Sequence, residues 1–245
     1  MWICGFSACA LSAQVAPQFK TQEIDTTVGI GYGLALADVD GDKRTDILLA
    51  DKDLIVWYQN PSWKKHVIAQ KLTDKDHVCI AARDIDGDGK CEIAVGAQWN
   101  PADTVDSGAV FYLAPPEDRT KLWNPIQLSH EPTTHRMRWV RNQAGRFDLI
   151  VAPLHGRGNK DGNGAGVRIL AYHKPLDMSH SWNTTLVTDA MHMTHNFEVL
   201  EGEPPSIAIG SKEGVNIFNF IKKHWQKSNH FLDNPTGEIK TSYFS

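Results

Sequence analysis

The sequence predicts an all-β fold, a β-propeller built from four-stranded blades. Aspartate-rich turns recur in ADVDGDKRTD, residues 37–46, and in ARDIDGDGKCE, residues 82–92, each between two short apolar segments. The matching third strands contain Tyr58, Tyr112 and Tyr172, which follow one another at nearly equal steps along the chain. No segment keeps an amphipathic helical period over three turns. Four-strand units that repeat at this spacing and are rich in turn residues are typical of propeller blades.

Each repeat unit is expected to contain four strands in the same order. In the first unit the strands are predicted at 34–37, 46–50, 56–61 and from Trp63. In the second unit they are predicted at 78–82, 92–96, 110–116 and from Trp123. The third unit keeps a third strand at 169–175 and a fourth from Trp182, but only Asp148 remains of its turn acids. Trp225 marks the fourth unit.

The predicted propeller domain covers residues 28–245. Its blades are expected at residues 28–72, 73–130, 131–190 and 191–231, with the start of a fifth at 232–245. Because an open ring leaves sheet edges unprotected, we expect the chain to be a fragment of a seven-bladed propeller. A closed ring of four blades is the alternative.

The segment 1–13 resembles an incomplete signal peptide, because it is apolar and rich in small residues but lacks a positive start. It predicts a secreted or periplasmic protein, and a misassigned start codon is the alternative. Cys79 and Cys91 flank one tight turn, and counting outward from that turn places Cys79 opposite residue 96, so no disulfide is expected between them.

The charge pattern gives no sign of a nucleic-acid or membrane partner. The 245 residues carry a formal net charge of −4, and no basic run extends beyond a pair of lysines. The oligomeric state stays open.

The aspartate turns place acidic side chains at positions 1, 3, 5 and 9 of each loop. These residues are Asp38, Asp40, Asp42 and Asp46 in the first loop, and Asp84, Asp86, Asp88 and Glu92 in the second. Carboxylates that converge from a tight turn suit Ca²⁺. The alternative is that the aspartates cap backbone N–H groups without a metal. Either role is structural, and no catalysis is expected there.

Histidines form a second pattern. His77, His135 and His195 open the first strands of the second, third and fourth blades, and first strands line the central channel of a propeller. His155 follows the second strand of the blade that His135 opens, so the antiparallel return of the chain is expected to bring the two together. The alternative is that these histidines only hold blades together. His66 and His173 are expected at the surface.

Several basic residues share the predicted neighbourhood of His135. Arg136, Arg138, Arg157 and the glycine-rich loop 156–166 belong to it. A histidine base, a second proton donor and an arginine that binds a carboxylate are the requirements for β-elimination on a uronic acid. The residues therefore indicate a site for an acidic sugar.

The aspartate loops resemble those of FG-GAP or VCBS-type repeats, the integrin-α-like propellers, and this resemblance implies Ca²⁺ in the loops. The stretches VCIAARDIDGDGKCEIAVGAQWNP, EPTTHRMRWV, PLHGRGN and MHMTHNFEV are similar to the propeller group that contains the dehydratase domain of aldos-2-ulose dehydratase and the lyases that release rhamnose from glucuronate. That similarity implies carbon–oxygen lyase chemistry on a sugar or a uronate-containing polysaccharide, histidine acid/base catalysis, and a divalent metal in the central cavity.

The resemblance implies acid/base roles for His135 and His155, and it makes His77 and His195 cavity residues or metal ligands. The catalytic candidates are His135, His155, His77 and Arg138, and the substrate-binding candidates are Arg136, Arg157, His195 and Trp99. Two alternative functions remain. One is a sugar dehydratase like aldos-2-ulose dehydratase, and the other is a non-catalytic FG-GAP/VCBS propeller that binds carbohydrate or protein.

Overall fold

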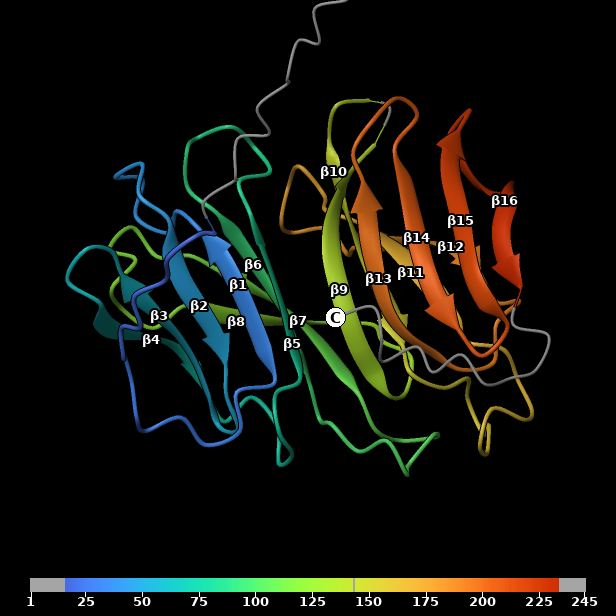
Figure 1. Cartoon of the computed structure of the whole chain (residues 1–245), viewed down its shortest axis with the longest axis horizontal. Helices are drawn as coiled ribbons and strands as arrows, with labels where there is room; N and C mark the ends of the chain where they lie inside the picture. Colours follow the sequence, from blue (N-terminus) through green and yellow to red (C-terminus); the bar gives the residue numbers. More distant parts are fainter. Residues whose placement is uncertain (1–15, 143, 234–245) are drawn as a thin grey trace, which may run out of the picture.

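The computed structural model describes residues 16–142 and 144–233, and within them the chain forms four antiparallel sheets of four strands each and no helix (Figure 1). Each sheet is one propeller-like blade, and its strands follow the order of the chain. The predicted fold class, all-β with four-stranded blades, is confirmed. The predicted signal peptide, residues 1–13, lies outside the described residues.

The four blades are named A to D in chain order. Blade A contains β1 (Gly33–Ala37), β2 (Asp46–Ala50), β3 (Leu54–Gln59) and β4 (Lys64–Gln70). Blade B contains β5 (Cys79–Arg83), β6 (Glu92–Ala97), β7 (Ala109–Ala114) and β8 (Asn124–Leu128). Blade C contains β9 (Thr134–Arg141), β10 (Phe147–Pro153), β11 (Ile169–His173) and β12 (Asn183–Thr188). Blade D contains β13 (Thr194–Leu200), β14 (Ser206–Ser211), β15 (Gly214–Ile221) and β16 (His224–Asp233).

Blade D ends later than expected, because β16 continues to Asp233, past the predicted boundary at residue 231. The rest of the predicted fifth blade, residues 234–245, is outside the part of the chain that the structure describes.

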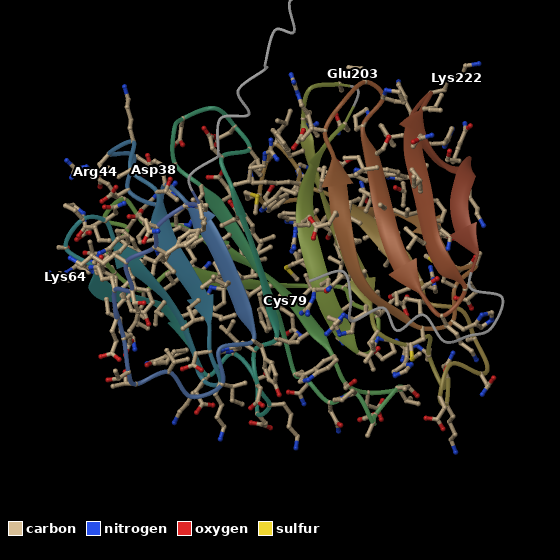
Figure 2. All side chains as sticks on the ribbon, viewed as in Figure 1. Asp38, Arg44, Lys64, Cys79, Glu203 and Lys222 are labelled. Atoms are coloured by element: carbon tan, nitrogen blue, oxygen red, sulfur yellow. The ribbon has the colours of Figure 1, made fainter. Side chains whose placement is uncertain are left out.

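The first strands of the blades lie together in the middle of the molecule. Figure 1 shows β1, β5, β9 and β13 side by side, with β4 and β16 farthest out, and β5 contacts both β1 and β9. The arrowheads of β1 and β13 point the same way, so these first strands start at one rim and end at the other. We call the rim with the turns after β1 and β5 the aspartate rim, where Figure 2 shows Asp38. The rim at the starts of β9 and β13, with His135 and His195, is the histidine rim.

Apolar packing holds the blades to one another. Because side chains alternate between the two faces of a strand, blades B and C each contribute buried residues to both of their neighbours. The resulting clusters lie at the A–B, B–C and C–D seams and include, respectively, Leu48, Trp57 and Ile93; Tyr112, Met137 and Leu149; and Ile150, Ile207 and Phe218. These three cores fix the relative positions of the inner strands.

Two of the inner strands carry a β-bulge at the histidine rim. In β9, Arg136 faces Ala152 and Thr134 faces Pro153, so His135 has no partner on β10. In β13 the register between Thr194 and Phe197 also shifts, at His195. By contrast, β5 pairs with β6 without irregularity. Because a bulge changes the direction in which a side chain points, His135 and His195 leave the regular pattern of their strands.

Candidate functional site

His135 is the centre of a stack of rings at the histidine rim. Its ring lies on the indole of Trp99, with centroids 5.0 Å apart, and the ring of His195 meets it edge-on at 4.6 Å. Nδ1 of His135 lies 3.2 Å from the backbone oxygen of His195, to which it donates in the neutral ring. Burial, helped by the charge of Arg136, lowers the pKa of His135 to about 3. His135 is therefore a neutral, buried ring that links blades C and D.

His155 and His195 complete the cluster. His155 is close enough to His135 to lower the pKa of its ring, as expected from the antiparallel return of the chain. Burial lowers the pKa of both His155 and His195. In each ring Nδ1 is buried and has no hydrogen-bond partner among the described residues. The two rings are thus neutral near pH 7, and each has a buried nitrogen without a partner among the described residues.

The backbone of His155 is held by one side chain, Thr133. The Thr133 hydroxyl accepts a hydrogen bond from the His155 N–H at 2.9 Å and donates one to the His155 carbonyl at 3.1 Å. Thr133 is fully buried, and its φ of 52° is unusual for a β-branched residue. The amide of Thr133 donates to the Ser107 hydroxyl at 3.2 Å. A loop of blade B therefore helps to set the position of His155.

A cavity of about 520 Å³ opens beside the cluster, between the inner strands. All four blades line it, through Tyr32, Gly33, Leu34, Cys79, Ile80, Arg136, Arg138, Asn196 and Glu198. We call this cavity the channel. Its wall on β1 is apolar, with Tyr32 47% and Leu34 65% exposed. Its wall on β9 and β13 is polar and charged.

The two arginines of the polar wall differ in their partners. Arg138 pairs with Glu198 at 3.8 Å. Arg136 donates from Nε to the Asn196 side-chain oxygen at 2.7 Å and from Nη1 to the His135 carbonyl at 3.4 Å. It has no carboxylate partner in the described part of the chain. Burial, and to a smaller degree Arg138, lowers the pKa of Arg136. The guanidinium of Arg136 thus faces the channel without a counter-charge.

Two predicted site residues are engaged elsewhere. His77 is fully buried, and its Nδ1 lies 3.0 Å from the Asp51 carbonyl, which ties blade B to blade A. Arg157 donates to the Val105 carbonyl at 2.6 Å and pairs with Glu131 at 3.7 Å, so it joins two loops. The assignment of His77 and Arg157 to the ligand site stays a prediction.

The structure adds polar residues to which the sequence analysis assigned no role in the site. Asn159, from the glycine-rich loop, is 1% exposed and donates to the carbonyl oxygens of Ala165 and His192 at 3.0 Å. His192 pairs through Nδ1 with Glu213 at 2.7 Å. His192 had a visible signal, since it stands shortly before His195 in the same motif, whereas Glu213 had none.

At the aspartate rim the two loops share one hydrogen-bond pattern. Asp38 accepts from the amides of Gly41 and Lys43, both at 2.7 Å, and Asp84 accepts from those of Gly87 and Gly89 at 2.7 and 3.0 Å. Gly41 and Gly87 have φ of 83° and 86°, a left-handed turn that glycine adopts at no steric cost. The aspartates therefore cap the turns, as one of the two sequence interpretations expects.

The carboxylates of each loop also converge. Oxygens of Asp38, Asp40 and Asp42 lie within 4.8 Å of one another, as do those of Asp84, Asp86 and Glu92. Asp46 and Asp88 are outside these two groups. Within residues 16–142 and 144–233, no other set of three histidine, cysteine or acidic side chains meets this spacing, so the histidine cluster does not have it.

Asp46 has a different task from the other loop acids. It is fully buried and accepts from the amides of Val39 and Asn60, both at 2.9 Å. These bonds fasten the loop to the end of β3, which indicates a purely structural role for this carboxylate.

Comparisons with known proteins bear first on the aspartate loops. A family model of the FG-GAP-like repeat matches residues 38–95, which include both of them. No curated protein matches the sequence. A solved structure of a mutant Aleuria aurantia lectin in complex with Fucα1-6GlcNAc superimposes on 84% of this chain with a TM-score of 0.47 and 12% identity. This chain spans 65% of that lectin chain.

The class of protein is therefore an all-β propeller with four-stranded blades, in which residues 38–95 match the model of the FG-GAP-like repeat. In the parts of the chain described above, no helix has the length and apolar character that a membrane crossing needs.

Proposed function

We propose that the chain is a carbohydrate-binding propeller, and that the histidine rim with the adjoining channel binds an acidic sugar. The observation that carries this proposal is a concentration of buried polar atoms without partners. Nδ1 of His155, Nδ1 of His195, Oδ1 of Asn159 and Oε2 of Glu213 all have no hydrogen-bond partner among the described residues. Such atoms are few in folded proteins, and each calls for a water, an ion or a ligand.

The acidic character of the ligand follows from Arg136. A partly buried guanidinium without a counter-charge is costly, and a carboxylate matches its planar, paired donors. Arg138 is already paired with Glu198, so Arg136 provides the free charge of the channel. A carboxylate of the ligand would offset it.

The shape of the channel supports a sugar as the carrier of that carboxylate. A sugar ring has C–H faces and hydroxyl edges, and the channel has an apolar wall with Tyr32 and Leu34 opposite a polar wall with Asn196 and Arg136. Ligand sites commonly combine an apolar lining with a few placed polar groups. The amphipathic channel therefore suits an acidic sugar better than a purely polar ion.

Ca²⁺ belongs to this proposal as a structural ion. The fitting residues are the two convergent groups, Asp38, Asp40 and Asp42, and Asp84, Asp86 and Glu92. Hard carboxylate oxygens at this spacing match the ligands of calcium, and a bound ion would offset the repulsion between these carboxylates.

A second candidate function is a carbon–oxygen lyase. It is favoured by the neutral state of His155 and His195, because an imidazole with a free nitrogen can accept a proton. In a uronate held by Arg136, the base would take the proton α to the carboxylate, the electron pair would form a double bond, and the C–O bond at the β position would break. The leaving oxygen would then take up a proton.

A binding titration, followed by an absorbance measurement on the same mixture, tests both functions. We expect oligosaccharides of galacturonic or glucuronic acid to bind the purified chain, and the neutral oligosaccharides of galactose or glucose to bind at least about tenfold more weakly. Arg136→Gln is expected to abolish this preference, whereas Arg141→Gln, at the exposed far end of the same strand, is expected to keep it. Equal affinity for acidic and neutral sugars would overturn the proposal. The ultraviolet absorbance of an unsaturated uronate, if it develops during incubation, identifies the lyase.

A further inference from the structure

Three histidines in the described part of the chain pair with a carboxylate, and they differ in what else they touch. His173 bonds to Asp148 at 2.9 Å, and its second nitrogen lies 3.1 Å from the Thr185 hydroxyl, so both ring nitrogens are used inside blade C. His180 lies 3.6 Å from Asp177, and these two side chains are largely exposed, at 74% and 66%. The third pair, His192 with Glu213, is partly exposed, at 41% and 33%. Its polar atoms do not all have hydrogen-bond partners.

Glu213 fixes the ring of His192. One carboxylate oxygen accepts from the ring Nδ1 at 2.7 Å and from the backbone amide of His192 at 3.1 Å. Because an ionised carboxylate only accepts hydrogen bonds, the proton of the neutral ring lies on Nδ1 and the other nitrogen, Nε2, is an acceptor. Two contacts to one oxygen hold the ring in place.

The pair leaves two acceptor atoms unused. Nε2 of His192 has no partner among the described residues, on a side chain that is 41% exposed. The second oxygen of Glu213, Oε2, is buried and also lacks a partner there. Two acceptors without a donor call for a partner that donates hydrogen bonds, either water or a hydroxyl group of a ligand.

The pair lies at the histidine rim, on the C–D seam. The carbonyl of His192 accepts the Asn159 side chain at 3.0 Å, and Met193 forms an isolated β-bridge with His155. His195, the partner of His135, follows closely along the chain. The His192–Glu213 pair therefore adjoins the cluster that carries the proposed function.

We propose that His192 and Glu213 form an acceptor subsite that binds hydroxyl groups of the sugar whose carboxylate contacts Arg136. This inference rests on the proposed function and extends it. The ligand must offer an anion at one end and free hydroxyl donors at the other, which an acidic sugar with unsubstituted hydroxyls does. An O-methylated sugar keeps its carboxylate but has lost these donors.

The test uses methyl glucuronoside and its fully O-methylated derivative as probes, with the whole chain as the protein. We expect the wild type to bind the hydroxylated probe about tenfold more tightly than the methylated one. Glu213→Gln exchanges an acceptor for a donor, and we expect it to lower the affinity for the hydroxylated probe about tenfold and to remove the difference between probes. Asp177→Asn makes a comparable change in the exposed pair and is expected to leave both affinities unchanged.

A spectroscopic measurement separates a ligand contact from a structural role. The ¹⁵N signal of His192 Nε2 should move when the hydroxylated probe is added, and not when the methylated probe is added at saturation. If Arg136→Gln abolishes binding while Glu213→Gln and His192→Phe do not weaken it, the subsite is overturned and the acidic-sugar site stands. If no acidic probe binds the wild type, the proposed function and this inference fail together.

Discussion

His135 and Trp99 stack with ring centroids 5.0 Å apart and planes 23° apart, and the outer strands of blade A repeat this geometry in His66 and Trp57, at 4.7 Å and 23°. Both histidines are buried, at 6% and 8% exposure. One stack lies at the histidine rim and the other within blade A, on its two outermost strands. The chain thus contains a matched pair of histidine–tryptophan contacts, of which only one adjoins the proposed ligand site.

This pair yields the first prediction. His135→Ala and His66→Ala should each lower the free energy of unfolding by roughly 1–3 kcal/mol, because each loses a buried stacked ring. Only His135→Ala should also weaken the binding of acidic oligosaccharides, by about tenfold or more. Urea denaturation and a binding titration measure the two effects. An equal loss of affinity in His66→Ala would show that the effect on binding is general destabilisation.

The second prediction concerns calcium. Asp86 is suited to the test, because its contact with the Asp88 amide, at 3.2 Å, can be kept by an asparagine oxygen. Adding Ca²⁺ should raise the melting temperature of the wild type, since a ligand that binds only the folded state stabilises it by mass action. Asp86→Asn should keep the melting temperature found without calcium and reduce the rise. A rise of the same size in Asp86→Asn would leave turn capping as the only role of this loop.

Thr133 gives the third prediction. Thr133→Val should lower the free energy of unfolding by about 1–3 kcal/mol, because the buried N–H and C=O of His155 lose their partner. Thr133→Ser keeps the hydroxyl and should stay close to the wild type. Thr133→Gly relieves the left-handed backbone but loses both bonds, so it should lie between them. Chemical denaturation ranks the three variants, and valine ranking level with serine would refute the role given to the hydroxyl.

The fourth prediction is a pH dependence set by His173. Its hydrogen bond to Asp148 raises the pKa of His173 above the ordinary 6.5. A raised folded-state pKa means that the protonated pair stabilises the fold fully below pH 6.5, and that this contribution is lost as pH rises through the raised pKa. The stability difference between wild type and His173→Gln should therefore shrink from about pH 5.5 to about pH 8.5. A difference that grows over this range would contradict the assignment.

Much of the fold was readable because each blade repeats local signals. Asp46 and Glu92 begin β2 and β6 as the turn spacing predicts, and Cys79 lies opposite Gly96 as counted from the turn. Cys79 and Cys91 are buried and unpaired, in agreement with the prediction from the sequence. These features depend on a few consecutive residues, so the tertiary structure had little chance to alter them.

The site was harder to predict, because a β-bulge changes the direction of a side chain without changing the amino-acid composition of the strand. The sequence placed His77, His135 and His195 in one register, but only the last two lie on bulges. His77 instead turns toward the Asp51 carbonyl. The bulges lie at the starts of β9 and β13, where too few residues precede them for a break in the apolar alternation to show in the sequence.

The expectation that His66 lies at the surface is wrong. His66 and Ile68 are both buried residues of β4, and both point toward the A–B core. There His66 stacks on Trp57. The prediction placed His66 on an outer strand of its blade and took that strand to be exposed. Glu213 shows the opposite difficulty, since only the folding of β14 and β15 brings it to His192.

The aspartate loops occupy blades A and B at one rim, whereas the bulges occupy blades C and D at the other. Under the proposals above, the ion and the sugar would thus bind at opposite ends of the strands. The concentration of calcium in the surroundings would then govern how long the molecule survives heat or protease. The calcium concentration would have little effect on the affinity of the protein for a sugar.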